Sequence, residues 1–393
     1  MKAVICGLLL CMACRSTQQE PVVGIFAGQA VQTRVDSSLA ACYFQADDPA
    51  CATERASVAA ALTHPAPNPT DRAAYADLAR RYSPDFATLR FASAVDARPE
   101  NRGARANFEE KLQRLRNGDR PARSLCARRL LVLVPGFAYR ADPATGADLS
   151  AQRTALQEIG CDTHFLEVDE IGTVESNATY IARELTRLIA ARQDAYDNMI
   201  LVSVSKGGAE VALALAMLDS AAAARVHAWV NVGGILRGTH LADHARVWPR
   251  SWLARGVFWF LGFPGELLSN LSTATRRPVF EALRIPAHIR RLNYLAAPLS
   301  GALQESVRGR YAELAPLGPN DGVTLLSDGF QREGVTIVEL QLDHYFKDSD
   351  IHFKTQALAW LVLEVAIEEN SNKFSPPWPP SIRNQDQGRE YAN

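Results

Sequence analysis

The chain has 393 residues, of which 47% are apolar and 22% are charged, and its formal net charge is −1. This length and composition are ordinary for a globular protein with a large core, in one big domain or two smaller ones. The balanced charge gives no basis for nucleic acid as a partner. No apolar run reaches the roughly 18–20 residues needed to span a bilayer.

The start of the chain has the pattern of an export signal. A lysine at the second position is followed by the short apolar stretch Ala3–Ala13, and Cys14 comes directly after it. A small residue before a cysteine resembles the lipobox of bacterial lipoproteins, in which the signal is cut before the cysteine and the thiol is acylated. The resemblance implies a signal peptide over residues 1–13, lipidation of Cys14 and, because Arg15 follows it rather than Asp, an outer-membrane protein facing the periplasm. Cys11 stands where that motif usually has Leu, so a cleaved signal without lipid is the alternative.

Three of the seven cysteines lie in this leader, which leaves four in the body. An even number in an exported protein favours disulfides. Cys42 and Cys51 are close in sequence and could close a small loop. Cys126 and Cys161 each precede an expected parallel strand, so they lie at one end of the sheet if those strands are neighbours. We predict the pairs Cys42–Cys51 and Cys126–Cys161, with four free thiols as the alternative.

The part before residue 128 carries no recognisable chemistry. Residues 14–36 are expected to form a tether, and residues 37–127 a mostly helical region. Spaced apolar positions predict three helices there, over 52–62, 72–82 and 107–115. Ser83 predicts the start of a further helix, because Pro84 suits the first helical position and Asp85 lies in the first turn. We expect this region to pack against the rest of the chain.

Strands and helices alternate over residues 128–369, which predicts a doubly wound, mostly parallel α/β sheet. The segment 129–134 is apolar throughout, as in a strand covered on both faces. Further strands are expected over 162–168, 199–202, 227–232, 290–297 and 335–342. Helices are expected over 146–160, 176–192, 306–314 and 352–369. Active groups of such sheets belong at the carboxyl ends of the strands.

Residues 235–287 interrupt this alternation and are rich in aromatic side chains, including Trp248, Trp252 and Trp259. Because the segment lies between two expected strands, we interpret it as an inserted cap or lid. Its aromatic density favours a surface that meets an apolar substrate, and ordinary core helix is the alternative. The polar, proline-rich residues 370–393 are expected to form a loosely held tail.

The sharpest chemical motif is centred on Ser205. The apolar strand over 199–202 leads into Ser203-x-Ser205-x-Gly207, and an Ala/Leu-rich helix follows. A nucleophile in such a strand-to-helix turn has strained backbone and an exposed Oγ, and its flanking positions must be small because strand and helix nearly touch. N–H groups at the helix start can hold an oxyanion. A plain Ser-Gly turn is the alternative.

Hydrolysis by a serine also needs a base and an acid that orients it. His344, at the end of an expected strand, is the predicted base, and His352 at the start of the last helix is the alternative. Asp321, in an Asn-Asp-Gly turn, is the predicted acid. Asp243 and Asp328 are its rivals, and a simple turn-forming role is the alternative for Asp321 itself.

The predicted oxyanion donors are the backbone N–H groups of Lys206, directly after the nucleophile, and of Phe137, after Pro135-Gly136. We expect the Lys206 side chain to be solvated, with an ion pair to Glu210 as the alternative. This chemistry needs no metal or organic cofactor.

Together these motifs resemble the α/β-hydrolase superfamily and, more narrowly, its lipase and esterase members. The resemblance covers residues 128–369 and is carried by four segments: Pro135-Gly136-Phe137, Ser203–Gly208, Asn320–Val323 and Asp343-His344. It implies an acyl-transfer triad in the order Ser205, Asp321, His344. The chain departs from the family's pattern in having Pro135 where many members have His, and Ser203 where Gly is usual.

The sequence therefore predicts an exported, lipid-anchored serine hydrolase that cleaves a small-molecule or lipid ester through an acyl-enzyme. A thioesterase or amidase with the same triad is the first alternative, because the scaffold hosts all three activities. The second is of another class, a non-catalytic envelope lipoprotein that uses the fold as a binding module. The oligomeric state and the natural ester do not follow from the sequence.

Overall fold

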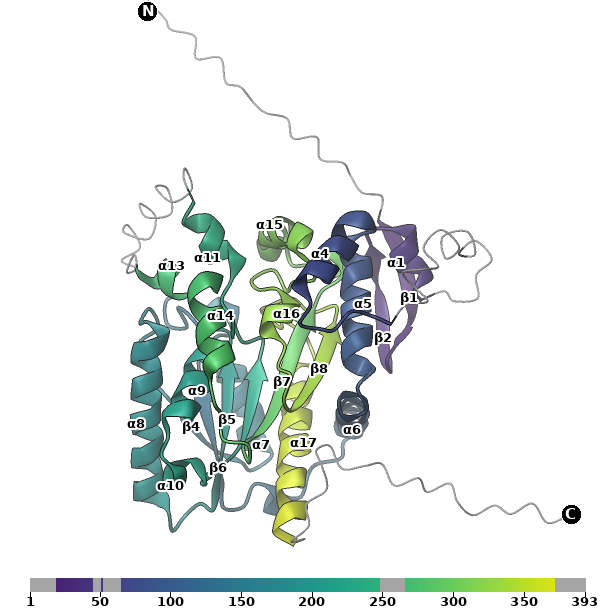
Figure 1. Ribbon diagram of the computed structural model, residues 1–393. Helices are drawn as coiled ribbons and strands as arrows, with labels where there is room; N and C mark the ends of the chain where they lie inside the picture. Colours follow the sequence, from purple (N-terminus) through teal and green to yellow (C-terminus); the bar gives the residue numbers. More distant parts are fainter. Residues whose placement is uncertain (1–18, 45–50, 52–64, 248–265, 372–393) are drawn as a thin grey trace, which may run out of the picture.

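Helices cover both faces of a six-stranded sheet in the computed structural model (Figure 1). The structure describes residues 19–44, 51, 65–247 and 266–371, with side chains up to residue 364. Several expectations fall outside these residues, namely the signal peptide, the lipidation site Cys14, the entire helix over 52–62, the aromatic stretch 248–265 and the tail after 371.

The central sheet is parallel throughout and has the strand order β4-β3-β5-β6-β7-β8. The strands are β3 (Arg129–Val134), β4 (Asp162–Phe165), β5 (Asn198–Val204), β6 (Val226–Val232), β7 (Arg290–Ala297) and β8 (Val335–Leu340). The chain moves from β3 outward to β4, then returns past β3 to β5 and continues to β8. This reversal creates a crevice at the carboxyl ends of the strands, where such sheets bind ligands. The predicted doubly wound, parallel α/β sheet is confirmed.

Side chains of the strands alternate between the two helical layers. In β3, Leu130 and Val132 pack on one layer, whereas Leu131 and Leu133 pack on the other. The first layer contains α8 (Val174–Arg192) and α9 (Lys206–Met217), and the second contains α6 (Pro99–Arg116), α7 (Ser150–Glu158) and α17 (Ile351–Ser371). Coverage on both faces explains why β3 has no polar position at its centre.

Residues 20–35 form an antiparallel hairpin instead of the expected tether. Its strands are β1 (Glu20–Phe26) and β2 (Gln29–Val35). Alternating apolar residues bury one face of the hairpin, as a half-buried sheet requires, and Val22, Val31 and Val35 are almost fully buried. These valines join the core of the N-terminal helices and of β7 and β8, so the segment is part of the body.

The N-terminal helices begin where capping rules predict. They are α1 (Ser38–Cys42), α4 (Arg72–Arg81) and α5 (Pro84–Asp96), and η1 (Arg123–Leu125) follows α6. Ser83 caps α5 as predicted, because its side chain accepts a hydrogen bond from the Phe86 N–H. The helix expected over 107–115 is the second half of the longer α6.

Polar side chains from this N-terminal part cover the free edge of β8. The Gln29 amide donates to the Val338 carbonyl at 2.9 Å and accepts from the Leu340 N–H at 3.1 Å. Asn101 accepts from the Thr336 N–H at 2.8 Å. These contacts replace the partners that another strand would supply, so the edge is protected from pairing with other chains.

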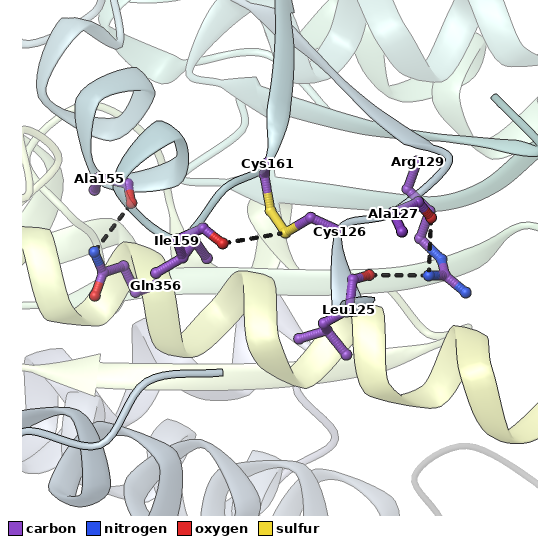
Figure 2. Close-up of a disulfide and its surroundings, with 8 residues drawn as sticks. All are labelled: Leu125, Cys126, Ala127, Arg129, Ala155, Ile159, Cys161 and Gln356. Atoms are coloured by element: carbon purple, nitrogen blue, oxygen red, sulfur yellow. Dashed lines mark hydrogen bonds between the residues drawn. A yellow bond between two sulfur atoms is a disulfide. The ribbon is translucent and has the colours of Figure 1, made fainter. Parts of the chain in front are cut away.

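Both predicted disulfides are present. Cys42 is joined to Cys51, and Cys126 to Cys161. Figure 2 shows the second bridge, which lies beside the carbonyl of Ile159 at the point where β3 and β4 begin. The two cysteines meet because their strands are parallel neighbours, as the sequence argument required.

The segment 235–287 lies between β6 and β7 and contributes α11 (His240–Ala245), α13 (Glu266–Asn270) and α14 (Thr273–Ala282). Its role as a cap or lid stays a prediction. The remaining helices are η2 (Pro143–Thr145), α10 (Ser220–Ala223), η3 (Ser300–Ala302), α15 (Glu305–Leu314), η4 (Ala315–Leu317) and α16 (Leu326–Gly329). No helix in the described part of the chain has the length and apolar character to cross a membrane.

Candidate active site

Ser205 occupies the sharp turn between β5 and α9. Its φ of 52° is positive, which is a strained conformation for a residue with a side chain. The Ser205 N–H donates to the Val232 carbonyl at 3.1 Å, and the Ser205 carbonyl accepts from the Ile235 N–H at 3.0 Å. The end of β6 therefore holds the strained turn in place, as expected for a nucleophile elbow.

Small residues around the turn are required by close backbone contacts. A Cβ on Gly207 would lie 2.5 Å from the Pro135 carbonyl oxygen, so no side chain fits there. A Cβ on Gly136 would lie 3.2 Å from the Cβ of Ser205. The loop after β3, which carries Phe137, thus passes directly against the turn.

The structure brings Ser205, His344 and Asp321 together. His344 Nε2 is 2.9 Å from Ser205 Oγ, and His344 Nδ1 is 2.7 Å from Asp321 Oδ2. Asp321 Oδ1 accepts from the N–H groups of Val323 and Thr324, each at 2.8 Å. With Oδ1 occupied, Oδ2 is left to accept from Nδ1–H, and Nε2 is then free to accept the proton of the serine hydroxyl.

The rival acids and the rival base are engaged elsewhere. Asp243 accepts hydrogen bonds from the backbone and the hydroxyl of Thr273, at 3.0 and 2.6 Å. Asp328 is bound by arginine side chains from α4 and α14. His352 Nε2 is 2.6 Å from the carboxylate of Glu158 at the end of α7. These contacts hold the three residues in other parts of the molecule.

Asp343 holds the loop that carries His344, a contribution that sequence reasoning missed. Its carboxylate accepts from the N–H and the side-chain amide of Gln304, at 3.1 and 2.9 Å, and from the Tyr345 N–H at 3.1 Å. These bonds tie the loop that carries His344 to the start of α15. The signal in the sequence was an acidic residue directly before the histidine. In the structure Asp343 is buried, with 2% of its surface exposed.

The expectation that Lys206 is solvated is wrong. Its side chain is buried, and Nζ is 2.7 Å from Glu210 Oε1. Glu210 also accepts from the Asn177 amide of α8 at 2.8 Å. Because α8 covers the first turn of α9, these side chains face a neighbouring helix instead of water. Burial raises the pKa of Glu210, and the Lys206 ammonium opposes that rise.

A row of buried polar side chains supports the elbow from the α8–α9 side. Ser203 Oγ accepts from Trp229 Nε1 at 2.8 Å and donates to Asn231 Oδ1 at 3.4 Å. Asn231 in turn donates to Asn293 Oδ1 at 2.7 Å. Ser203 thus has partners that a glycine at this position would lack. Asn231 was missed, although a lone Asn in an apolar strand is a visible signal.

The two residues predicted to donate to an oxyanion lie beside Ser205. Lys206 is the first residue of α9, and Phe137 lies on the loop that contacts Ser205. Phe137, Ser205 and His344 line one cavity of about 380 Å³. The donor role of both amides stays a prediction. Within the described residues, no cluster of three or more His, Cys, Asp or Glu side chains could bind a metal ion.

No family model matches this chain, and no curated protein matches it in sequence. Solved structures resemble it at low identity. The metagenomic carboxyl esterase MGS0156 is 23% identical, with 61% of this chain and 76% of that chain covered and a TM-score of 0.49. The mature lipase BlEst2 from Bacillus licheniformis is 18% identical, with 62% and 92% covered and a TM-score of 0.47. Est1E from Butyrivibrio proteoclasticus is 16% identical, with 63% and 90% covered and a TM-score of 0.36. Such identities are too low to transfer a function.

Proposed function

We propose that this chain is a serine hydrolase that cleaves carboxylic esters. The supporting observation is the hydrogen-bonded series Asp321–His344–Ser205, which ends at a strained strand-to-helix turn. A buried Ser or His can be structural, but this series combines a nucleophile, a base and an orienting carboxylate within hydrogen-bond distance.

In this proposal the Ser205 Oγ attacks the ester carbonyl while His344 Nε2 takes the hydroxyl proton. Asp321 keeps the proton on Nδ1 and stabilises the imidazolium that forms. The N–H groups of Phe137 and Lys206 bind the oxyanion of the tetrahedral intermediate. The intermediate expels the alcohol, which receives the proton from His344. Water then attacks the acyl-enzyme with His344 again as base, and the acid is released.

A fluorophosphonate probe tests this proposal directly, because it modifies only an activated serine. We expect the folded wild-type protein to be labelled, and Ser205→Ala to lose both the label and the hydrolysis of p-nitrophenyl butyrate. Ser327→Ala, which removes a buried serine outside the triad, is the matched control and should keep both. Absence of labelling in folded wild-type protein would favour the non-catalytic binding module.

The same attack opens thioesters and amides. Matched ester, thioester and amide substrates with one acyl group distinguish these activities by their kcat/KM values. We expect the ester to be preferred over the amide, and a clear preference for the thioester would reassign the enzyme as a thioesterase.

We also propose that the protein is exported and anchored through an acylated Cys14 at the outer membrane. The leader sequence supports this, and so do two disulfides in the described residues, because disulfides persist in oxidising compartments. Growth with an alkyne-bearing palmitate should label the wild-type protein. Cys14→Ala should lose the label and leave the membrane fraction, whereas retention of the label in Cys14→Ala would exclude this anchor.

A further inference from the structure

Three valines at the centre of the sheet are only half-buried. Val202 and Val204 of β5 and Val232 of β6 face the layer that contains α17. On the other face of β5, Leu201 and Ser203 are fully buried. Central strands covered by helices on both faces are normally buried on both. The partial exposure of the valines therefore marks unfilled space between the sheet and α17.

This space is the cavity of about 380 Å³ that also contains Ser205 and His344. An engineered cavity of about 150 Å³ already binds benzene. On β5 and the turn after it, the cavity is lined by Ser205, Val204 and Val202 and is bounded by Ile200, whose side chain is 2% exposed. Along α17 its lining residues recur at helical spacing: Ile351, Lys354, Thr355, Leu358, Ala359, Val362 and Leu363. The cavity is thus a channel between sheet and helix.

The lining changes from polar to apolar with distance from the surface. The exposed Asp142 and the half-buried Arg310 line the outer end, where Arg310 donates to the hydroxyl of Tyr345, the residue after His344, at 2.9 Å. Leu131, Ile200 and Leu363 lie at the inner end and are at most 2% exposed. The inner end is therefore closed and suited to a hydrocarbon chain.

The polar side chains among the α17 residues that line the channel already have hydrogen-bond or ion-pair partners. Thr355 Oγ1 donates to the Ile351 carbonyl at 2.7 Å, and Lys354 Nζ is 2.6 Å from Glu339 Oε1. Neither group therefore needs a polar ligand in the channel. An occupant without polar atoms leaves these bonds intact.

We propose that this channel holds the acyl chain of the substrate, which makes esters of linear medium- to long-chain fatty acids the preferred class. This inference rests on the proposed function, since the ester carbonyl must lie at Ser205. A closed channel suits the acyl side because the chain stays bonded to Ser205 Oγ after the alcohol has left. The alcohol must depart before water attacks, so it belongs at the open, polar end.

Ala359 offers a way to shorten the channel. It lies on α17 eight residues after Ile351, or about 12 Å along the helix at roughly 1.5 Å per residue. Its methyl group faces the channel, so a larger side chain at this position would occupy the inner half. The catalytic residues and the outer half would remain unchanged.

The test compares kcat/KM for p-nitrophenyl butyrate and p-nitrophenyl dodecanoate in the full-length protein. We expect wild type to prefer dodecanoate by about tenfold or more, since even one methylene group can be worth that much in a matched pocket. Ala359→Phe should lose at least about tenfold on dodecanoate and keep its activity on butyrate within a small factor. The matched control is Ala151→Phe on the exposed side of α7, which should behave as wild type.

An equal loss on both esters in a folded Ala359→Phe variant, or a wild type that does not prefer dodecanoate, would overturn the channel. If Ala359→Phe does not fold, Ala359→Leu provides the same comparison with a smaller obstruction. Dodecyl acetate, which puts the long chain on the alcohol, should be a poor substrate, and a preference for it would reverse the assignment. If the protein is labelled by the fluorophosphonate and hydrolyses butyrate but shows no chain-length effect, the channel is refuted and the proposed function is kept. Loss of labelling itself would refute the proposed function.

Discussion

Asp321 shows how one residue satisfies two interpretations of the same motif. The Asn-Asp-Gly sequence predicts a turn, and Gly322 indeed adopts a φ of 91°. The turn directs the N–H groups of Val323 and Thr324 onto Asp321 Oδ1, so the other oxygen is oriented toward His344. The turn-forming role is therefore compatible with the proposed role of Asp321 as the acid that orients His344.

Replacing Asp321 by Asn should lower kcat by about 10⁴-fold, because an amide that keeps its oxygen on the backbone donors presents an NH₂ group to His344 and stabilises the wrong tautomer. The measurement is steady-state hydrolysis of p-nitrophenyl butyrate. Asp243→Asn is the control, since Asp243 binds Thr273 away from the site. A loss of less than about tenfold in Asp321→Asn, or a larger loss in Asp243→Asn, would contradict the assignment.

Gly207→Ala should abolish the proposed ester hydrolysis and destabilise the protein, because the new methyl group would lie 2.5 Å from the Pro135 carbonyl oxygen and would displace the turn at Ser205. Butyrate hydrolysis and the denaturation midpoint measure the two effects. Gly309→Ala is the matched control: it lies in α15, has no atom within 4 Å of the added Cβ, and should gain about 0.5–1 kcal/mol of stability. Normal activity in Gly207→Ala would show that the turn can relax.

At the scale of elements, the link between β3 and β4 illustrates how pairing limits a strand. The sequence predicts a strand over 162–168, but β4 ends at Phe165, because β3 is its single neighbour among the described strands and their register stops at Leu133. The Cys126–Cys161 bridge lies directly before β3 and β4 in the chain and holds the starting ends of these two strands together. Gln356 of α17 donates to the Ala155 carbonyl of α7 at 3.0 Å nearby (Figure 2).

The two disulfides should differ in their contribution to stability. Cys126–Cys161 spans 35 residues and Cys42–Cys51 spans 9. In the chain-entropy model these loops correspond to about 4 and about 2.5 kcal/mol. Paired Cys→Ser variants measured by denaturant unfolding should therefore show the larger loss for Cys126 and Cys161. Equal losses, or a larger loss for Cys42 and Cys51, would indicate that strain or the denatured state dominates.

At the scale of the whole molecule, a pair of buried carboxyl groups joins the N-terminal hairpin to the rest. The Asp36 N–H donates to Asp85 Oδ2 at 2.8 Å, and the Asp85 N–H donates to Asp36 Oδ2 at 3.2 Å. Ser300, after β7, donates to Asp85 from its N–H and its hydroxyl. Three distant segments thus meet at Asp85. Burial, together with the charge of Asp36, raises the pKa of Asp85 to about 7.

This raised pKa predicts a pH dependence of stability. Between the ordinary pKa of 3.8 and about 7, the folded state keeps a proton that the unfolded chain has lost. The stabilisation that comes from protonated Asp85 is therefore complete below pH 3.8. It is lost as the pH rises to about 7, which lowers the free energy of unfolding by on the order of a few kcal/mol. Denaturant unfolding across this range should show the decline in wild type and a weaker one in Asp85→Asn. Asp77→Asn, on the surface of α4, should follow wild type, and an unchanged slope in Asp85→Asn would contradict the prediction.

Local rules were sufficient to predict many of the strands, helix starts and turns of this protein from the sequence alone. Uninterrupted apolar strands, the Ser83 cap and the small residues around Ser205 each depend on a few neighbouring residues, so the pattern was sufficient. The order of Ser205, Asp321 and His344 followed from a family resemblance, and the structure brings these three together.

Only the tertiary structure decided what depends on contacts between distant segments. Lys206 is buried because α8 covers it, and Gln29 belongs to the body because β8 needs partners at its edge. The channel beside Val204 exists because α17 lies apart from the sheet there, which no periodicity in either element records. The sequence thus determined how Ser205 is placed in its strand-to-helix turn, whereas tertiary packing decided what can lie beside it.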